Sequence, residues 1–303
     1  MILDALIHLA FVLALPPLLL GVIGKVKAFF AGRVGPPLVQ PYRDLARLFR
    51  KSEVVSTTTT WVFRAGPVVM LATALVAAML VPFGGRPAPL SFSGDLILFA
   101  YLFALARFFT VAAAMDTGSA FEGMGAAREA TFAALAEPAL FLAFLTLVRA
   151  SGSLSLTGML GHGLGRAWSS ASASLVFVVV SLFVVLLVES SRVPFDDPAT
   201  HLELTMIHEV MVLDHSGPML GTIHYAAALK LLVLGALVAR LVAPVSTGSL
   251  PLDWLVFAGS ILAVAIVVGV VESVMARLRL LQIPLLLVGA CLLSGFALVL
   301  FAR

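Results

Sequence analysis

The chain contains 303 residues, of which 61% are hydrophobic and 12% are charged, and its formal net charge at pH 7 is +3. Soluble domains contain about 25% charged residues, so this composition excludes an ordinary soluble protein and indicates an integral membrane protein. The small net charge, without a basic patch interleaved with aromatic residues, excludes nucleic acid as a partner.

Eight apolar runs have about the 20-residue length that an α-helix needs to cross a bilayer. A membrane β-barrel would instead use short segments of alternating polarity. We therefore predict an all-α polytopic membrane protein with a single transmembrane domain over residues 1–303 and additional cytoplasmic amphipathic helices. The first run lacks the basic flank and cleavage site of a signal peptide, so we expect it to be retained. The predicted spans are Asp4–Ile23, Ala65–Phe83, Asp95–Met115, Ala130–Arg149, Ser172–Val188, Tyr225–Leu241, Asp253–Val271 and Leu280–Phe301.

Basic residues in the loops predict the orientation, because short loops rich in Lys and Arg stay in the cytoplasm. The first, third, fifth and seventh loops, with the adjoining helix ends, contain twelve basic residues, and the opposite side contains five. This asymmetry predicts that both termini lie outside. Of the sixteen acids, thirteen fall on the cytoplasmic side, so one face of the protein is expected to hold nearly all of its ionisable chemistry.

The first loop, residues 24–64, is basic and is punctuated by glycine and proline near its start. Tyr42–Lys51 is predicted to form a short amphipathic helix with Leu45, Leu48 and Phe49 on one side, and such helices lie at the membrane interface. Two simpler interpretations stay open. The helix only anchors the loop to anionic lipid, and its charged residues form only weak surface ion pairs.

Arg107 in the third span and Lys230 in the sixth are the basic residues most strongly expected within the membrane, where an unpaired charge is costly. Candidate partners are Glu122 and Glu129, which share a helix face at their seven-residue spacing, and Glu137, about two turns deeper. Such groups can relay protons. Alternatively, the first two acids are solvated loop charges, Glu137 is structural, and the basic side chains extend to the nearer interface.

The most densely charged stretch lies in the loop over residues 189–224. Between Glu189 and Gly217 it contains six carboxylates, one arginine and three histidines. An ionised group at the bilayer centre costs about 2.5–3.5 kcal/mol even on lenient insertion scales. The cluster is therefore predicted to be functional or solvated.

The three histidines, His201, His208 and His215, recur every seven residues. They would share one face of an amphipathic helix predicted over Ala199–Leu213, if that helix continued far enough. Histidine titrates near neutral pH, so proton transfer is one role, and helix capping or a surface position is another. A metal site is not predicted, because two helical turns separate these residues by about 10 Å.

Three ordered stretches resemble a known family. They read RVGPPLVQPYRDLARLFRKSE from Arg33, MDTGSAFEGMGAAREATFAALAEP from Met115, and ESSRVPFDDPATHLELTMIHE from Glu189. They resemble the eight-helix family that contains the quinone-site membrane subunit of proton-pumping NADH:quinone oxidoreductase, and the match covers nearly the whole chain. Within that family, the second and third stretches are similar to membrane subunits of formate hydrogenlyase and related energy-converting NiFe hydrogenases.

Two departures from the respiratory subunits argue against a quinone site. Those subunits usually read close to ETNRTPFDLPEAEAEL, whereas Asp197 here replaces the leucine and Thr200 and His201 stand where acids are common. Pro37 stands where the respiratory subunits usually have asparagine. The shared acidic positions are retained, so the inherited feature is a polar channel.

The resemblance implies a membrane-anchor subunit that couples electron flow in a soluble hydrogenase module to translocation of H⁺ or Na⁺. It implies soluble NiFe large and small subunits, an iron–sulfur protein and antiporter-like membrane subunits as partners, in a bacterial or archaeal inner membrane. The NiFe centre and iron–sulfur clusters are expected in those partners and no cofactor in this chain. The expected coupling residues are Arg107, Glu122, Glu129, Glu137, Glu189, Arg192, Asp196, Asp197, His201, Glu203, His208, Glu209, Asp214 and Lys230. The expected docking residues are Arg33, Gln40, Arg43, Asp44 and Arg47.

The sequence shows no redox, nucleotide or hydrolytic centre of its own. The single Cys291 cannot form a disulfide or ligate an iron–sulfur cluster by itself, and the usual phosphate-loop, zinc-protease and serine-hydrolase motifs are absent. Two other functions stay open. One is a quinone-binding subunit whose cavity is formed by the first span, the Tyr42–Lys51 helix and the sixth span. The other is a stand-alone ion transporter, although no internal repeat is visible.

Overall fold

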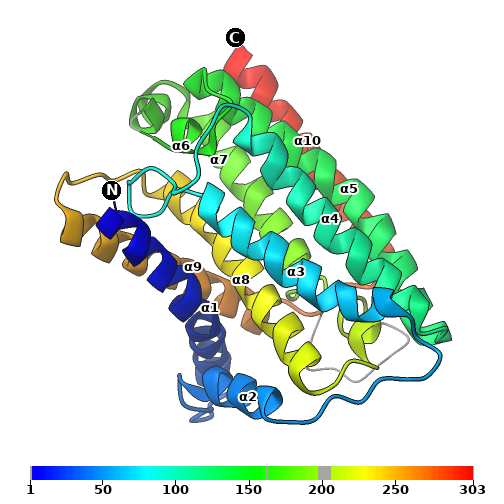
Figure 1. Cartoon of the computed structure of the whole chain (residues 1–303). Coiled ribbons are helices and arrows are strands. Elements are labelled where there is room, and N and C mark those ends of the chain that lie inside the picture. The colour runs from blue at the N-terminus through cyan, green and yellow to red at the C-terminus, as the bar shows by residue number, and fades with distance from the viewer. Residues whose placement is uncertain (1, 162, 197–205, 303) are drawn as a thin grey trace.

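The computed structural model describes residues 2–161, 163–196 and 206–302. Within these ranges the regular structure is entirely helical, and eight helices are long and apolar enough to cross a membrane, which confirms the predicted all-α polytopic fold (Figure 1). The eight are α1 (Ile2–Phe30), α3 (Trp61–Leu80), α4 (Asp95–Asp116), α5 (Ala120–Ser151), α7 (Gly163–Glu189), α8 (Gly217–Val242), α9 (Leu250–Val274) and α10 (Ile283–Ala302). The shorter helices are α2 (Gln40–Phe49), α6 (Leu156–Met159) and the 3-10 helices η1 (Glu209–Val212) and η2 (Leu280–Gln282).

Several helices begin before the apolar runs that predicted them. Helix α5 begins at Ala120 instead of Ala130, and α8 begins at Gly217 instead of Tyr225. The added turns pack against protein, since Glu122 and Gly217 are both buried. Hydropathy reports contact with lipid and not helicity as such, so it misses turns of this kind.

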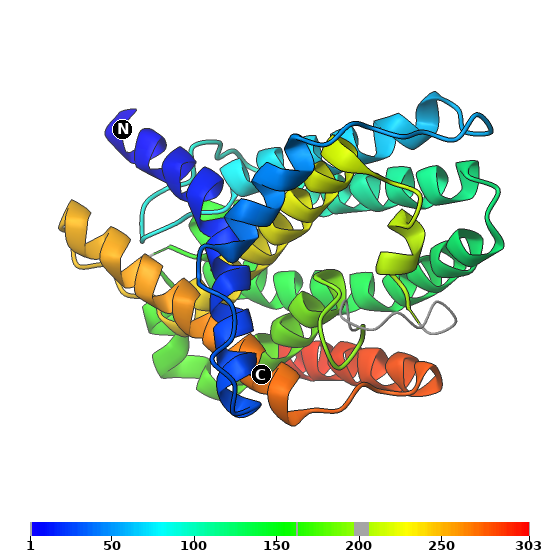
Figure 2. The same cartoon turned by 90° about the horizontal axis from the view of Figure 1, so that it is seen from below.

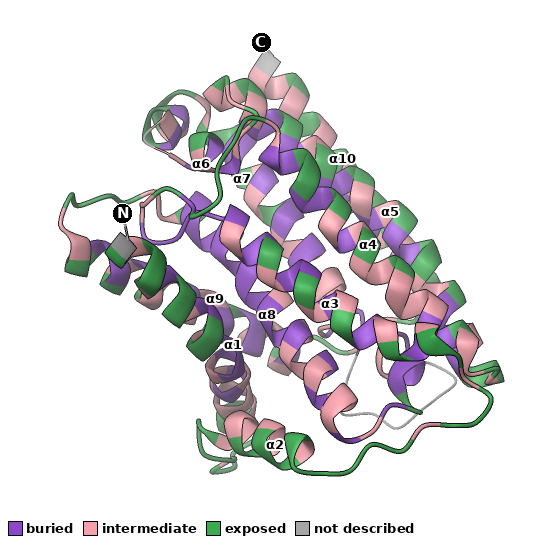
Figure 3. Ribbon diagram, viewed as in Figure 1, coloured by how far each residue is buried: buried purple, intermediate pink, exposed green. Residues whose placement is uncertain are grey.

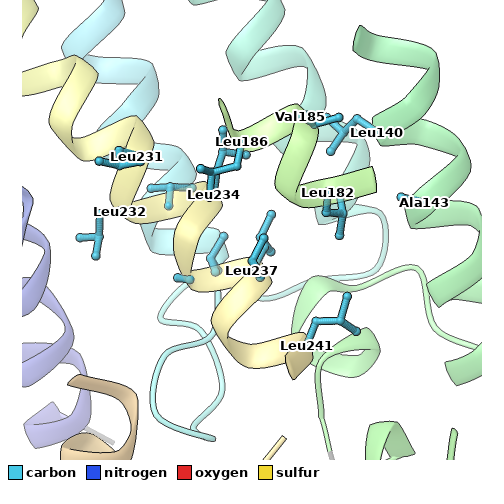
Figure 4. Packing of buried hydrophobic residues seen from close by; sticks show 14 of the residues in the cluster. Leu140, Ala143, Leu182, Val185, Leu186, Leu231, Leu232, Leu234, Leu237 and Leu241 are labelled. Carbon is cyan, nitrogen blue, oxygen red and sulfur yellow. The ribbon is translucent and has the colours of Figure 1, made fainter. Parts of the chain in front are cut away.

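Helix α8 lies at the centre of the bundle and contacts α1, α2, α3, α7 and α9. Nearly all of its side chains over residues 226–241 are buried (Figure 3). Its leucines, including Leu234 and Leu237, pack beside Leu182 and Leu186 of α7 (Figure 4). In a membrane this close packing stabilises the bundle through van der Waals contacts, because lipid tails are as apolar as leucine.

Five helices form a ring. Helix α8 contacts α3 and α7, α4 contacts α3 and α5, and α5 contacts α7, which closes the circle (Figure 2). We call the end of the bundle with α2 and the loops over 31–60, 190–196, 206–216 and 275–279 the basic end. Both termini lie at the opposite end (Figure 1).

The segment over residues 206–216 folds back into the mouth of the ring at the basic end (Figure 2). The predicted helix over 199–213 is wrong where it can be compared. Residues 197–205 lie outside the described residues, and 206–213 contain only the 3-10 turn η1. Residues 210–212 of η1 are consecutively buried, whereas an amphipathic helix would expose part of such a run. The carboxylate of Asp196 instead turns the chain by accepting the backbone N–H groups of Ile207 (3.1 Å) and His208 (2.9 Å).

Asp116, in the second motif stretch, fixes the start of α3 from the end of α4. Its carboxylate accepts the backbone N–H groups of Thr60 (2.6 Å) and Phe63 (3.2 Å). These groups belong to the first turn of α3, where backbone N–H groups have no intrahelical partner. The motif therefore contributes to the ring by joining two of its helices.

We predict that Gly125→Ala lowers the stability of the protein by about 1–3 kcal/mol, because added methyl groups overpack a full site. A Cβ atom at Gly125 would lie 2.4 Å from Val210 and 2.9 Å from the carbonyl oxygen of Ile207, where η1 packs on α5. The matched control is Gly123→Ala, because no atom lies within 4 Å of a Cβ there. Unfolding in detergent micelles measures both. Equal stability of the two variants would contradict the packing of η1 against α5.

Candidate functional site

Arg107 of α4 lies inside the ring, between three carboxylates from two other helices. Its Nε is 3.4 Å from Glu129, and its two terminal nitrogens donate hydrogen bonds to Glu137 and Glu189. The Arg107 side chain is only 10% exposed. The guanidinium group presents donors along several edges, so a single arginine can bind acids that approach from different helices.

Lys230 of α8 completes this group, which we call the Arg107 cluster: Arg107, Glu129, Glu137, Glu189 and Lys230. The Lys230 ammonium is 2.5 Å from Glu189 and 5.5 Å from the centre of the Phe103 ring. Glu189, the last residue of α7, is 8% exposed and lies between the two cations. The cluster therefore contains three carboxylates and two cations, and it leaves one carboxylate without a matching positive charge.

One cavity lies at the Arg107 cluster, and a second cavity adjoins the first. The first, about 30 Å³, is lined by Arg107, Glu129, Glu189 and Lys230. A site of this size has room for about two water molecules. The second, about 270 Å³, lies between α1, α8 and the loops at the basic end. Ser191 and His208 line both cavities, so the two cavities lie next to each other between the basic end and the Arg107 cluster.

Five titratable side chains line the second cavity: Arg192, Asp196, His208, Glu209 and His224. Asp196 is also 3.1 Å from Arg277, which holds the loop over 190–196 against the segment that follows α9. Arg192 is 3.4 Å from Glu272 of α9, and Glu272 is 3.0 Å from Lys27 of α1. Ion pairs thus fix the loop to α9 and to the segment that follows it, and Glu272 also joins α9 to α1.

Glu272 is a residue that the sequence reasoning missed. Its side chain is 1% exposed between Lys27 and Arg192. The predicted seventh span ended at Val271, so Glu272 was grouped with the charges at the end of a helix. Its position in the sequence could have indicated this role, because an acid that directly follows an apolar run needs a cation as partner if it is buried.

Glu122 and Glu129 have different partners despite lying on one side of α5. Glu122 is fully buried and accepts the backbone N–H of Asp214 at 3.0 Å, whereas Glu129 binds Arg107. The interpretation of Glu122 as a solvated loop charge is therefore wrong. Asp214 has an exposed side chain and lies apart from the Arg107 cluster.

Lys230 pairs with Glu189 instead of with Glu122, Glu129 or Glu137, which the spacing had suggested as its partners. Helix α7 ends at Glu189, one residue beyond the predicted span, and the packing of the ring brings this carboxylate between Arg107 and Lys230. Neither Arg107 nor Lys230 extends to an interface, because both form buried ion pairs. Asp197, His201 and Glu203 lie outside the described residues.

His208 and His215 do not lie on a common helix face. His208 lines both cavities, and His215 stacks on Phe63 with ring centroids 3.9 Å apart. Burial lowers the pKa of His215 to about 4. This histidine is therefore neutral near pH 7 and packs as an aromatic side chain.

The predicted docking residues lie on and before α2 at the basic end. Arg33, Arg43 and Arg47 are exposed. Gln40 donates a hydrogen bond of 2.9 Å to Asp44, and Arg47 is 3.8 Å from Asp44. The apolar side of α2 faces inward, since Leu48 and Phe49 lie beside Gly221 of α8. The helix therefore turns a basic face outward.

Comparison with known proteins identifies the family. A family model described as NADH dehydrogenase matches residues 3–303. The chain belongs to the NADH dehydrogenase subunit 1 family. Hydrogenase-4 component C of Escherichia coli K12 is 32% identical over 93% of this chain and 90% of its own length. Formate hydrogenlyase subunit 4 of the same organism is 32% identical, over 92% of each chain.

More distant members of the family include a subunit of the NADH-quinone oxidoreductase of Rubrobacter xylanophilus, 26% identical over 72% of this chain and 67% of its own. A chain in the structure of the membrane-bound sulfane sulfur reductase (MBS), an archaeal respiratory membrane complex, is 22% identical, covers 99% of both chains and has a TM-score of 0.85. These findings confirm the resemblance seen in the three motif stretches. This member of the family is homologous to membrane subunits of hydrogenase and respiratory complexes.

We predict that Arg107→Met lowers the free energy of unfolding by about 3–5 kcal/mol, because it leaves Glu129 and Glu137 without a cation and the buried Glu189 with Lys230 alone. The matched control is Arg64→Met, which removes an ion pair with Glu53 (3.5 Å) from an arginine that is 62% exposed. Exposed pairs contribute only about 0–1 kcal/mol. Chemical unfolding in mixed micelles compares the two. A loss for Arg107→Met no larger than that of the control would contradict the compensating role of Arg107.

Proposed function

We propose that this chain is the membrane-anchor and coupling subunit of a multi-subunit NiFe hydrogenase complex similar to formate hydrogenlyase. The observation that carries the proposal is the Arg107 cluster inside the ring, with two adjoining cavities between it and the basic end. The two relatives at 32% identity, named for hydrogenase-4 and formate hydrogenlyase, support the choice of complex.

The chain would couple electron transfer in its partners to ion movement through the carboxylates of the ring. Protons would enter at the second cavity, where Asp196, His208 and Glu209 lie, and pass His208 to reach Glu189 and Glu129. Among the three carboxylates and two cations of the Arg107 cluster, the unmatched carboxylate supplies a position where one proton or one Na⁺ can be held. A conformational change in the loop over 190–196, which directly follows Glu189, would alter the ion pairs of the Arg107 cluster. The proton or Na⁺ held there would then move.

The redox chemistry would belong to the partner subunits. The described residues contain one cysteine, Cys291, inside α10, so the chain offers no thiolate set for an iron–sulfur cluster. A NiFe centre and iron–sulfur clusters in soluble large, small and iron–sulfur subunits would supply the electrons. Antiporter-like membrane subunits would continue the ion path beyond this chain.

The soluble module would dock at the basic end, where Arg33, Arg43 and Arg47 are exposed around α2. The asymmetry of basic residues supports a cytoplasmic position for this end, with both termini on the outer side of a bacterial or archaeal inner membrane. Asp197, His201 and Glu203 belong to the same charged loop and would contribute to the entry of protons.

The second cavity supports the quinone-binding alternative less well than it supports ion movement. Its volume of about 270 Å³ is below the roughly 300–1,000 Å³ of most small-molecule sites. Five titratable side chains line it, and no residue of α2 does. A polar cavity of this kind suits water better than a quinone ring. The transporter alternative is disfavoured because the relatives named above are components of complexes.

We predict that Glu137→Gln and Glu203→Gln each lower hydrogen evolution or ion pumping by the assembled complex, by up to about 100-fold, because each removes a proton-carrying group. Glu53→Gln in the first loop serves as the control. Gas production and pH changes in inverted vesicles give the readout, and size-exclusion chromatography checks assembly. Normal pumping in both variants would contradict the relay.

The docking proposal predicts that reversing Arg33, Arg43 and Arg47 to Glu together detaches the soluble module, because the added acids repel an acidic partner surface. The matched control is Arg166→Glu, which reverses an exposed arginine at the opposite end of the bundle. A pull-down of soluble subunits from membranes measures retention. Unchanged retention in the triple variant would count against docking at α2.

A further inference from the structure

An apolar groove lies on the outer side of α7 and α10, away from the interior of the ring. It has a volume of about 870 Å³ and is lined by Val180 and Val184 of α7 and by Leu286 and Leu293 of α10, among others. Gln282, at the basic end, is the polar residue in its lining. A cavity of this size is comparable to a small-molecule site, and its surface suits hydrocarbon.

The length of the groove along α10 matches the thickness of one leaflet of a bilayer. Its apolar lining on α10 runs from Leu285 to Phe296, which is about 16 Å along a helix axis. Half of a bilayer core is about 15 Å thick. A neighbouring transmembrane helix would need a contact surface along the whole core, about 30 Å. The groove therefore fits an acyl chain of one leaflet better than a helix.

The rim of the groove at the basic end is positively charged. Arg279 is exposed directly before η2, and its backbone N–H donates a hydrogen bond of 3.3 Å to the Gln282 side chain. The nearby acids Asp196 and Glu272 are buried and bound to arginine or lysine. An exposed arginine next to Gln282, at one end of an apolar groove, is complementary to an anionic headgroup whose acyl chain lies in the groove.

We propose that this groove binds one anionic phospholipid, with its phosphate at Arg279 and Gln282 and an acyl chain along α10. The site goes beyond the coupling function and does not rest on it. It also touches the loop over 190–196. Leu278 lines the groove, and its backbone N–H donates a hydrogen bond of 3.0 Å to the carbonyl oxygen of Pro194. A bound lipid would thus support the segment that holds Asp196 through Arg277.

The acyl-chain part of the proposal is tested at Gly289, which lines the groove and where an added Cβ would meet no atom within 4 Å. Gly289→Phe should fill the groove without a clash. The matched control is Gly259→Phe in α9, where a Cβ also meets open space. The complex containing each variant is loaded with phosphatidylglycerol in mixed micelles, and native mass spectrometry measures the lipid that stays bound. We expect Gly289→Phe to lower retention about tenfold and the control to match the wild type.

The headgroup part is tested by Arg279→Glu, with Arg166→Glu at the opposite end as the control. Arg279→Glu should abolish the preference for phosphatidylglycerol over phosphatidylcholine, and the control should retain it. Equal retention of phosphatidylglycerol in the two phenylalanine variants would overturn the site. A cross-link from Leu292→Cys in the groove to another protein subunit would also overturn it, because a helix would then be the occupant.

Discussion

The interaction on which the rest of this structure depends is the set of ion pairs around Arg107. Moving a charge from water into a protein interior costs several kcal/mol, and only well-placed partners repay it. The acids that pair with Arg107 come from α5 and α7, and Lys230 comes from α8. The ring of helices must therefore hold a fixed register. Close contacts such as the packing of η1 at Gly125 help to set that register.

The basic end combines the proposed partner surface with the entrance to the charged interior. Helix α2 packs against α8 at Gly221, and α8 positions Lys230 further along the same helix. The loop over 190–196 is tied to α9 by Arg192 and Glu272. A partner bound at α2 would thus touch elements that are directly connected to the buried acids. Side-chain packing and ion pairs form that connection, and such contacts can adopt discrete alternative arrangements.

The family relationship and the geometry support different parts of the functional proposal. The match over residues 3–303 shows a membrane subunit of the NADH dehydrogenase subunit 1 family. The relatives at 32% identity favour hydrogenase complexes among the members of that family. The cavities favour ion movement over quinone binding, because charged side chains line them.

The sequence by itself determined the number and order of the membrane helices, because apolar runs of bilayer length have few other solutions. It also marked Arg107, Glu137 and Lys230 as charges that needed partners, since isolated charges in such runs are costly. The family resemblance rested on motifs that can be read directly from the chain. The local sequence pattern is sufficient to predict these features.

Only the tertiary structure decided which charges meet. Glu189 joins Arg107 and Lys230, Glu122 binds a backbone group, and Glu272 pairs with Arg192. These contacts link residues far apart in the chain, so their geometry depends on how the helices pack. The same holds for residues 206–213, whose amphipathic pattern suggested a helix but which turn inward because η1 is buried inside the ring. Local spacing defines a helix face, whereas packing against other helices defines its partners.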